Sequence, residues 1–174
     1  FNTPINIRDA AVRAMAEGHT KYTPGRGTLE LREAICVKLE RDNNISYTPD
    51  QIIVSNGAKH SLSTICQAVL DHNDEVIVFS PYWVSFPEII RLADGIPIIV
   101  KTLSDKNFAP DWDDLEKKIS PKTAAILLNS PSNPTGSVWN DETIKKLLTL
   151  AAKHNWLVIS DECYERLVYD NQYN

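Results

Sequence analysis

Two polar segments of the sequence carry residue types that could bind and activate a small molecule. Asn133 lies in residues 129–136, which contain two prolines and a glycine, and Asp161 and Tyr164 follow further along. Each segment comes directly after an apolar run that is typical of a buried strand. Open α/β sheets bind ligands at the carboxyl ends of their strands, so this placement favours a ligand site.

Asp161 ends a run whose residues are nearly all apolar. A carboxylate in such surroundings is costly to ionise without a cationic partner, and a protonated pyridine nitrogen would be one. Such a ring would act as an electron sink that stabilises negative charge on the substrate's Cα. The alternative is that Asp161 caps a helix at Tyr164 and its neighbours, because Asp is a common capping residue.

The loop at residues 129–136 is built to be stiff. Pro131 and Pro134 restrict its backbone, and Gly136 permits a positive φ. A stiff loop would hold the Asn133 amide, which is both a donor and an acceptor, in a fixed direction. Read alone, however, the Asn-Pro-Thr-Gly segment is a turn.

Three further positions have both a binding and a plain structural interpretation. Residues 55–61 combine a strand end, a glycine turn and a helix start, which suits a phosphate dianion but equally a tight turn with Lys59 on the surface. Trp83 could stack on a flat ring or pack in the core. Tyr22 lies in a loop without apolar periodicity, where it could simply be exposed. The four histidines lack carboxylate or metal partners in the pattern, which favours a solvated surface, and we expect no metal site.

Strand and helix patterns alternate along the chain and must position these residues. The predicted strands cover residues 52–54, 75–79, 96–100, 124–128 and 156–159. The predicted helices cover residues 29–42 behind a Thr28 cap, 62–70, 84–93, a short stretch behind Asp111 and a longer one behind Asn140. The strand runs show little polar alternation, so both faces of the sheet are expected to be covered. The predicted fold class is α/β, with three α/β/α layers and a mainly parallel sheet.

The composition is that of a globular protein without a nucleic-acid or membrane surface. Among 174 residues, 43% are hydrophobic, and the net charge of −5 comes from scattered lysines, arginines and acids. No apolar run has the length of a membrane span. Cys36, Cys66 and Cys163 are odd in number and lack metal-ligand spacing, which favours free thiols in the reducing cytoplasm. Cys36 and Cys66 lie at apolar helical positions, where we expect them to be buried.

Six segments, in this order and spacing, resemble the class I (fold-type I) pyridoxal-phosphate (PLP)-dependent aminotransferases, especially the aspartate aminotransferase branch. They are residues 21–24, 31–35, 57–59, 81–85, 129–136 and 161–164. The resemblance implies a set of cofactor contacts. Gly57, Ala58 and Lys59 would line the phosphate end of the cofactor. Trp83 would stack on the pyridine ring and touch the substrate carboxylate.

The resemblance also assigns the polar strand-end residues. Asn133 would bind the phenolic oxygen of the ring and help to hold the substrate α-carboxylate, and Tyr164 would bind the same phenolic oxygen. Asp161 would pair with the ring nitrogen. Tyr22 would reach across a dimer interface to the partner's cofactor phosphate.

The implied function is amino-group transfer through PLP from an amino acid, expected to be aspartate, to a 2-oxo acid. We expect a cytoplasmic homodimer at full length, with amino acid and 2-oxo acid substrates and no nucleic-acid or membrane partner. Residues 1–174 would be part of the cofactor-binding large domain, with the Schiff-base lysine and the small domain outside them. The chain alone is therefore expected to have no transaminase activity.

Three other interpretations remain open. A PLP-dependent C–S lyase or decarboxylase would share this scaffold, because Asp161, Asn133 and Tyr164 would serve the cofactor rather than one substrate. A non-catalytic PLP-sensing domain of a regulator would do so as well. In the third interpretation, the chain is an α/β domain whose motifs are only turns and caps.

Overall fold

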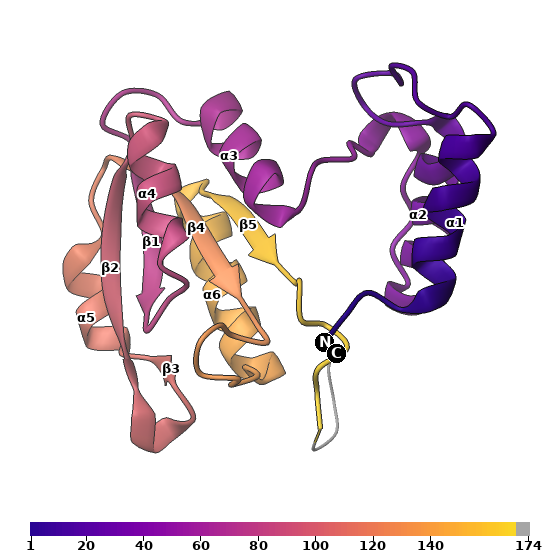
Figure 1. Ribbon diagram of the computed structural model, residues 1–174. Coiled ribbons are helices and arrows are strands. Elements are labelled where there is room, and N and C mark those ends of the chain that lie inside the picture. The colour runs from indigo at the N-terminus through magenta and orange to yellow at the C-terminus, as the bar shows by residue number, and fades with distance from the viewer. Residues whose placement is uncertain (170–174) are drawn as a thin grey trace. The chain divides into compact units, whose positions relative to one another are not determined.

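The computed structural model describes residues 1–169. By its internal contacts the chain divides into two compact units, Phe1–Ser55 and a second unit that begins at Asn56. The first unit is helical, and the second contains the sheet (Figure 1). Each unit is described by itself below.

The first unit contains helices α1 (Ile5–Ala16) and α2 (Leu29–Asn43) and the 3-10 turn η1 (Pro49–Gln51). Helix α2 confirms the prediction, and the Thr28 hydroxyl caps it by accepting from the Leu31 N–H at 3.4 Å. Buried Arg32 donates to the carbonyls of Gly27 at 3.3 Å and Pro49 at 2.7 Å. Arg32 therefore ties α2 to the segments before and after it.

The predicted strand at residues 52–54 is wrong. No strand forms there, and Ile53 is 61% exposed. Its β-branched residues favour an extended backbone, but the segment has no neighbouring strand to form a ladder. Val54 instead donates a lone backbone hydrogen bond to the Arg26 carbonyl at 3.1 Å.

The second unit is built on one five-stranded sheet with the order β3-β2-β1-β4-β5. Its strands are β1 (Glu75–Ser80), β2 (Ile96–Leu103), β3 (Ala109–Pro110), β4 (Thr123–Asn129) and β5 (Leu157–Asp161). All neighbouring pairs are parallel except β2–β3. Four of the predicted strands are confirmed, whereas β3, an antiparallel strand of two residues, was not predicted.

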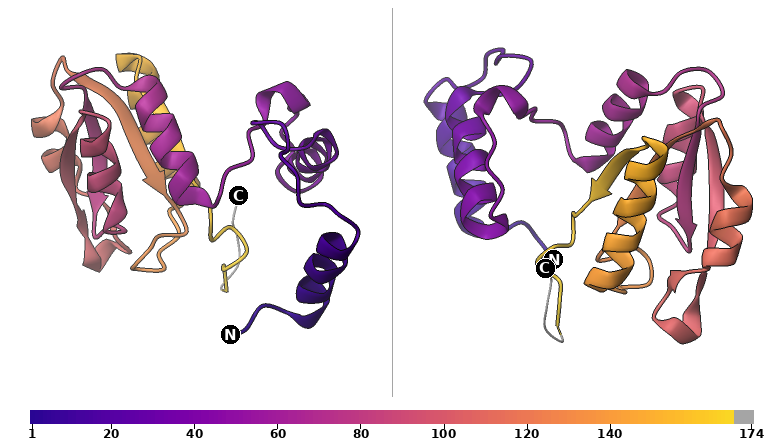
Figure 2. Two further views of the ribbon diagram at one scale, coloured as in Figure 1. Left: turned by 45° about the horizontal axis from the view of Figure 1, so that its top comes forward. Right: turned by 180° about the vertical axis from the view of Figure 1, so that it is seen from behind.

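Helices cover both faces of this sheet, which confirms the three-layer prediction. Helices α3 (Ala58–Val69) and α4 (Ser85–Leu92) pack on one face, and α5 (Trp112–Lys118) and α6 (Asp141–His154) pack on the other. Figure 2 shows α6 in front of the strands when the molecule is seen from behind, whereas Figure 1 shows it behind them. Strand β1 runs between the two layers, and its residues 76–79 are buried in succession.

The capping predictions are confirmed, but some apolar positions are more exposed than expected. Asp111 caps α5 by accepting from the Asp114 N–H at 3.1 Å, and Asn140 caps α6 by accepting from the Thr143 N–H at 2.9 Å. Three residues that were predicted to face inward remain more than a third exposed, namely Ile65, Val69 and Leu148. Each helix has an apolar arc wider than one sheet face can cover.

The cysteines follow the prediction only in part. Cys66 is fully buried, Cys36 is half-buried and Cys163 is exposed, and all three are free thiols. Burial raises the pKa of the Cys66 thiol, because the thiolate loses its hydration there.

Candidate active site

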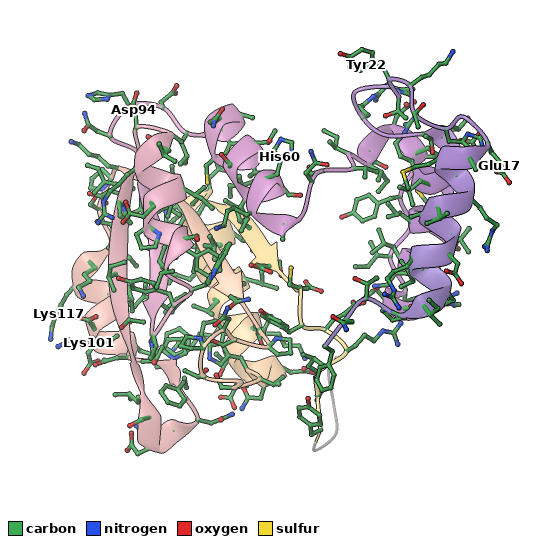
Figure 3. The ribbon with its side chains drawn as sticks, viewed as in Figure 1. Glu17, Tyr22, His60, Asp94, Lys101 and Lys117 are labelled. Carbon is green, nitrogen blue, oxygen red and sulfur yellow. The ribbon has the colours of Figure 1, made fainter. Side chains whose placement is uncertain are left out.

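A cleft of about 320 Å³ opens at the carboxyl ends of β4 and β5, beside the start of α3. Its lining residues come from five separate segments of the second unit: Gly57, Ala58, Lys59, Trp83, Phe86, Asn129, Asn133, Asp161, Cys163 and Tyr164. Seven of the eight site residues predicted from the sequence are in this list. The eighth, Tyr22, belongs to the first unit, where its side chain is fully exposed (Figure 3).

The start of α3 is shaped to receive an anion. Gly57 occupies the N-cap with φ +84°, a conformation that favours glycine, and no side chain caps the helix. The Gly57 carbonyl accepts from the N–H groups of His60 and Ser61. The N–H groups of Ala58 and Lys59 precede this first helical bond, so they lack partners within the helix and can donate to a ligand.

His60 supports this turn in a way that the sequence pattern did not indicate. It is exposed, as expected, but its Nδ1 accepts a hydrogen bond from the Asn56 N–H at 3.1 Å (Figure 3). This bond requires an unprotonated Nδ1, and it fixes the backbone just before Gly57.

Trp83 has contacts on two sides, one with the core and one with the cleft. Its indole meets the buried Phe86 ring edge-on, with a centroid distance of 5.4 Å, and packs against the core on that side. It also lines the cleft, and the Lys59 ammonium lies 4.9 Å from its ring centroid. The Phe86 contact therefore holds the indole against the core, and the Lys59 ammonium makes a cation–π contact with its ring.

The ends of β4 and β5 are joined by side-chain hydrogen bonds. Asn129 and Asp161 are paired in the register, and the Asn129 Nδ2 donates to the Asp161 carbonyl at 3.1 Å. The Asn129 Oδ1 accepts from the Asn133 N–H at 2.9 Å. The sequence prediction missed Asn129, although it is the first residue of the polar segment that pointed to Asn133.

Asp161 makes a local hydrogen bond and can still accept bonds from a ligand. Its Oδ1 accepts from the Cys163 N–H at 3.1 Å, which forms an Asx turn. No helix begins there within residues 1–169, so the helix-cap alternative is not observed. No cationic side chain within residues 1–169 forms an ion pair with this half-buried carboxylate. A cationic ligand in the cleft could therefore pair with it directly.

Cys163 and Tyr164 complete this side of the cleft. Partial burial raises the pKa of the Cys163 thiol, and the adjacent Asp161 carboxylate raises it further. Tyr164 is 38% exposed and lines the cleft.

The described part of the chain contains neither a metal cluster nor a membrane-spanning helix. Residues 1–169 contain no cluster of three or more His, Cys, Asp or Glu side chains that could hold a metal ion. Within the same residues, no helix combines the length and apolarity needed to cross a bilayer.

The second unit has three α/β/α layers, a helix start that can receive an anion, and Asp and Asn side chains at its strand ends. This is the architecture of the fold-type I aminotransferase large domain. The comparison of sequences agrees. The family model for aminotransferase class I and II matches residues 1–174, and the chain belongs to that family.

Several characterised members are closely similar. The aspartate aminotransferase of Bacillus subtilis is 51% identical over 169 residues, which are 97% of this chain and 43% of that protein. The aspartate/prephenate aminotransferase of Thermus thermophilus is 46% identical and covers 99% of this chain. A solved structure of Thermus thermophilus aspartate aminotransferase with maleate superposes with a TM-score of 0.94 over 99% of this chain and 45% of its own length, at 46% identity. The chain thus spans less than half the length of these relatives.

Proposed function

We propose that this chain is part of the cofactor-binding large domain of a PLP-dependent aminotransferase that moves an amino group from aspartate to a 2-oxo acid. One observation carries the proposal. Seven residues that were selected from four segments of the sequence for contacts with cofactor or substrate line a single cleft. A set of unrelated turns and caps would not be expected to converge in this way.

The residues present suit the phosphate end of the cofactor. The uncapped start of α3 offers the N–H groups of Ala58 and Lys59 and the positive end of a helix of 12 residues. The Lys59 ammonium adds a full positive charge from the same turn. Gly57 allows the chain to enter the helix with a positive φ, which leaves these donors accessible.

The residues present also suit the ring. Trp83 would lie against its face, and the Asn133 amide and Tyr164 hydroxyl would bind its phenolic oxygen. Asp161 would hold the proton on its nitrogen, because the carboxylate lacks a cationic partner in the described chain. When bound, PLP supplies a protonated ring that stabilises negative charge on the substrate's Cα.

Within residues 1–169, the lining of the cleft contains one lysine, Lys59, and one carboxylate, Asp161, that could carry a proton. Lys59 belongs to the phosphate end, and its ammonium lies over Trp83. Asp161 is committed to the ring nitrogen in this proposal. We therefore propose that the lysine that moves the proton belongs to a part of the protein beyond residues 1–174, together with the small domain. The 174-residue chain alone would then be inactive.

The choice of donor is supported by the relatives. Two are named for aspartate, and one solved relative was determined with maleate, a four-carbon dicarboxylate. Trp83 and Asn133 would contact the α-carboxylate of the substrate. We further propose a cytoplasmic homodimer, in which Tyr22 extends to the partner's cofactor phosphate, and its complete exposure leaves it accessible for that contact.

The test is a coupled assay of the full-length protein with PLP, aspartate and 2-oxoglutarate. We expect oxaloacetate beyond one equivalent per bound PLP to form only when the 2-oxo acid is present. Ammonia release without a 2-oxo acid would indicate a lyase instead, and carbon dioxide release a decarboxylase. PLP binding without turnover of any amino acid would favour a sensing domain. The 174-residue chain, assayed in parallel, is expected to show no turnover.

A further inference from the structure

Asn129 makes two hydrogen bonds that lead to two different parts of the cleft. Its Nδ2 donates to the main-chain carbonyl of Asp161 at 3.1 Å, and its Oδ1 accepts from the main-chain N–H of Asn133 at 2.9 Å. The two partners fix the orientation of the amide, because a carbonyl can only accept and an N–H can only donate.

Each bond adds to the contacts that already hold its segment. The loop that carries Asn133 closes on its own backbone, since the Ser132 N–H donates to the Ser137 carbonyl and the Gly136 N–H donates to the Ser132 carbonyl. Asp161 accepts from Cys163, two residues further along. Strand β5 is already paired with β4 as far as Asp161, and the Asn129 side chain adds a further bond there. The same side chain links the Asn133 loop to the end of β4.

An amide is the side-chain group that performs both tasks at this place. A carboxylate accepts from Asn133 but cannot donate to the Asp161 carbonyl, and an alanine can do neither. Asn129 is half-buried and lines the cleft itself, so water cannot fully replace the lost bonds.

We infer that Asn129 is a positioning residue, which sets the Asn133 amide and the Asp161 carboxylate in their relative places for one ring. The inference rests on the proposed function, because it assigns those two side chains to the same cofactor. Asn129 acts through them and needs no contact with the reacting atoms.

Hydrogen exchange at the main-chain N–H of Asn133 tests whether Asn129 holds the Asn133 loop. This measurement needs no cofactor. Pro131 and Pro134 carry no amide hydrogen, so residues 131–134 contribute only Ser132 and Asn133 to the exchange of this stretch. In the full-length protein, Asn129→Ala is expected to speed exchange at Asn133 about tenfold, because its acceptor is gone. Ser132 keeps its bond to Ser137 and serves as the internal reference.

A second variant separates the two bonds. Asn129→Asp retains an oxygen for the Asn133 N–H, so that amide is expected to stay protected, while the donor to Asp161 is lost. If Asn129→Ala fails to fold, this variant still decides the matter. Rapid exchange of Asn133 in Asn129→Asp would overturn the inference.

Titration with PLP tests whether Asn129 positions Asn133 and Asp161 for the cofactor. We expect Asn129→Ala to weaken PLP binding about tenfold, the effect of one net hydrogen bond of about 1.4 kcal/mol. The matched control is Thr102→Val, which removes a hydroxyl that donates to the Ser80 carbonyl at 2.7 Å, also at strand ends but outside the cleft.

The outcomes are distinct. Equal PLP affinities for Asn129→Ala and Thr102→Val, or unchanged exchange at Asn133 in Asn129→Ala, would overturn the positioning role. A wild-type protein that does not bind PLP would contradict the proposed function instead, and the exchange comparison would still report whether Asn129 orders the loop.

Discussion

Replacing Asp161 by asparagine isolates the charge that is assigned to the ring nitrogen. The asparagine Oδ1 can still accept from the Cys163 N–H, a bond of 3.1 Å in the structure, so the turn after β5 is retained. The carboxylate is half-buried, and no cationic side chain among residues 1–169 pairs with it. The substitution therefore removes a charge without breaking an ion pair in the described chain.

The expected loss follows from the kind of bond removed. A hydrogen bond between a carboxylate and a protonated ring nitrogen contributes about 1.5–3 kcal/mol, against about 1 kcal/mol for a neutral bond. Asp161→Asn keeps at most a neutral bond and is therefore expected to weaken PLP binding by about 0.5–2 kcal/mol, which is roughly 2- to 30-fold. The free energy of unfolding without cofactor is expected to change by less than about 0.5 kcal/mol, because the bond to the Cys163 N–H is retained and no ion pair is lost.

Equilibrium dialysis of the full-length protein against PLP measures this effect, and the next residue provides the control. The Glu162 carboxylate accepts from the Ser160 hydroxyl at 2.7 Å and lies outside the cleft. Glu162→Gln removes the same charge one residue away, and we expect less than a twofold change in affinity. Equal losses in both variants would mean that only the general negative potential matters, which would refute the assignment of Asp161.

Three further predictions follow from other parts of the structure. Gly27→Ala is expected to lower the free energy of unfolding by about 3 kcal/mol in urea titrations, because φ is +90° and a Cβ would lie 2.6 Å from the Val54 Cγ2. Gly25→Ala, where a Cβ meets nothing within 4 Å, is its control and is expected to change stability by less than about 1 kcal/mol. Alkylation of Cys163 at pH 8, followed by mass spectrometry, is expected to be faster in Asp161→Asn, because the carboxylate that raises the pKa of the thiol is gone; an unchanged rate would contradict this. The pKa of Asp114 is lowered by hydrogen bonds from the Lys118 ammonium and the Lys101 N–H, so its stabilisation is present at neutral pH and is lost as the pH falls through that lowered value. The difference in unfolding free energy between the wild type and Asp114→Asn is thus expected to shrink below about pH 4. A difference that grew below this pH would contradict the prediction.

The apolar pattern was sufficient to predict the core of the sheet. Strands β1 and β4 are buried on both faces, so their runs of Val, Ile, Leu and Ala carry little alternation and are easy to recognise. The caps of α2, α5 and α6 were also predictable, because a single Thr, Asp or Asn accepts from the backbone three residues later.

Elements that depend on distant partners were harder to predict. The β-branched residues 52–54 read as a strand, but no other strand lies beside them. Helix α1 was not predicted, and none of its residues is buried. Strand β3 has two residues, and its pairing with β2 leaves no periodic signal.

The site residues also differ in how far the sequence could predict them. The apolar runs before them pointed to Asp161, Asn133 and Gly57. Their residue types suggested ligand binding as well as turns or caps. The roles of Asn129 and His60 depend on partners that only the folded chain brings within hydrogen-bond distance. A polar amide at the end of a buried strand was the one signal in the sequence that could have pointed to Asn129.

A crystal structure of the full-length protein with PLP tests the central claim most directly. We expect the phosphate at the start of α3, within hydrogen-bond distance of the Ala58 and Lys59 N–H groups. The ring is expected to lie against Trp83, with its nitrogen on the Asp161 carboxylate. A cofactor bound outside this cleft, or a ring nitrogen turned away from Asp161, would contradict the account.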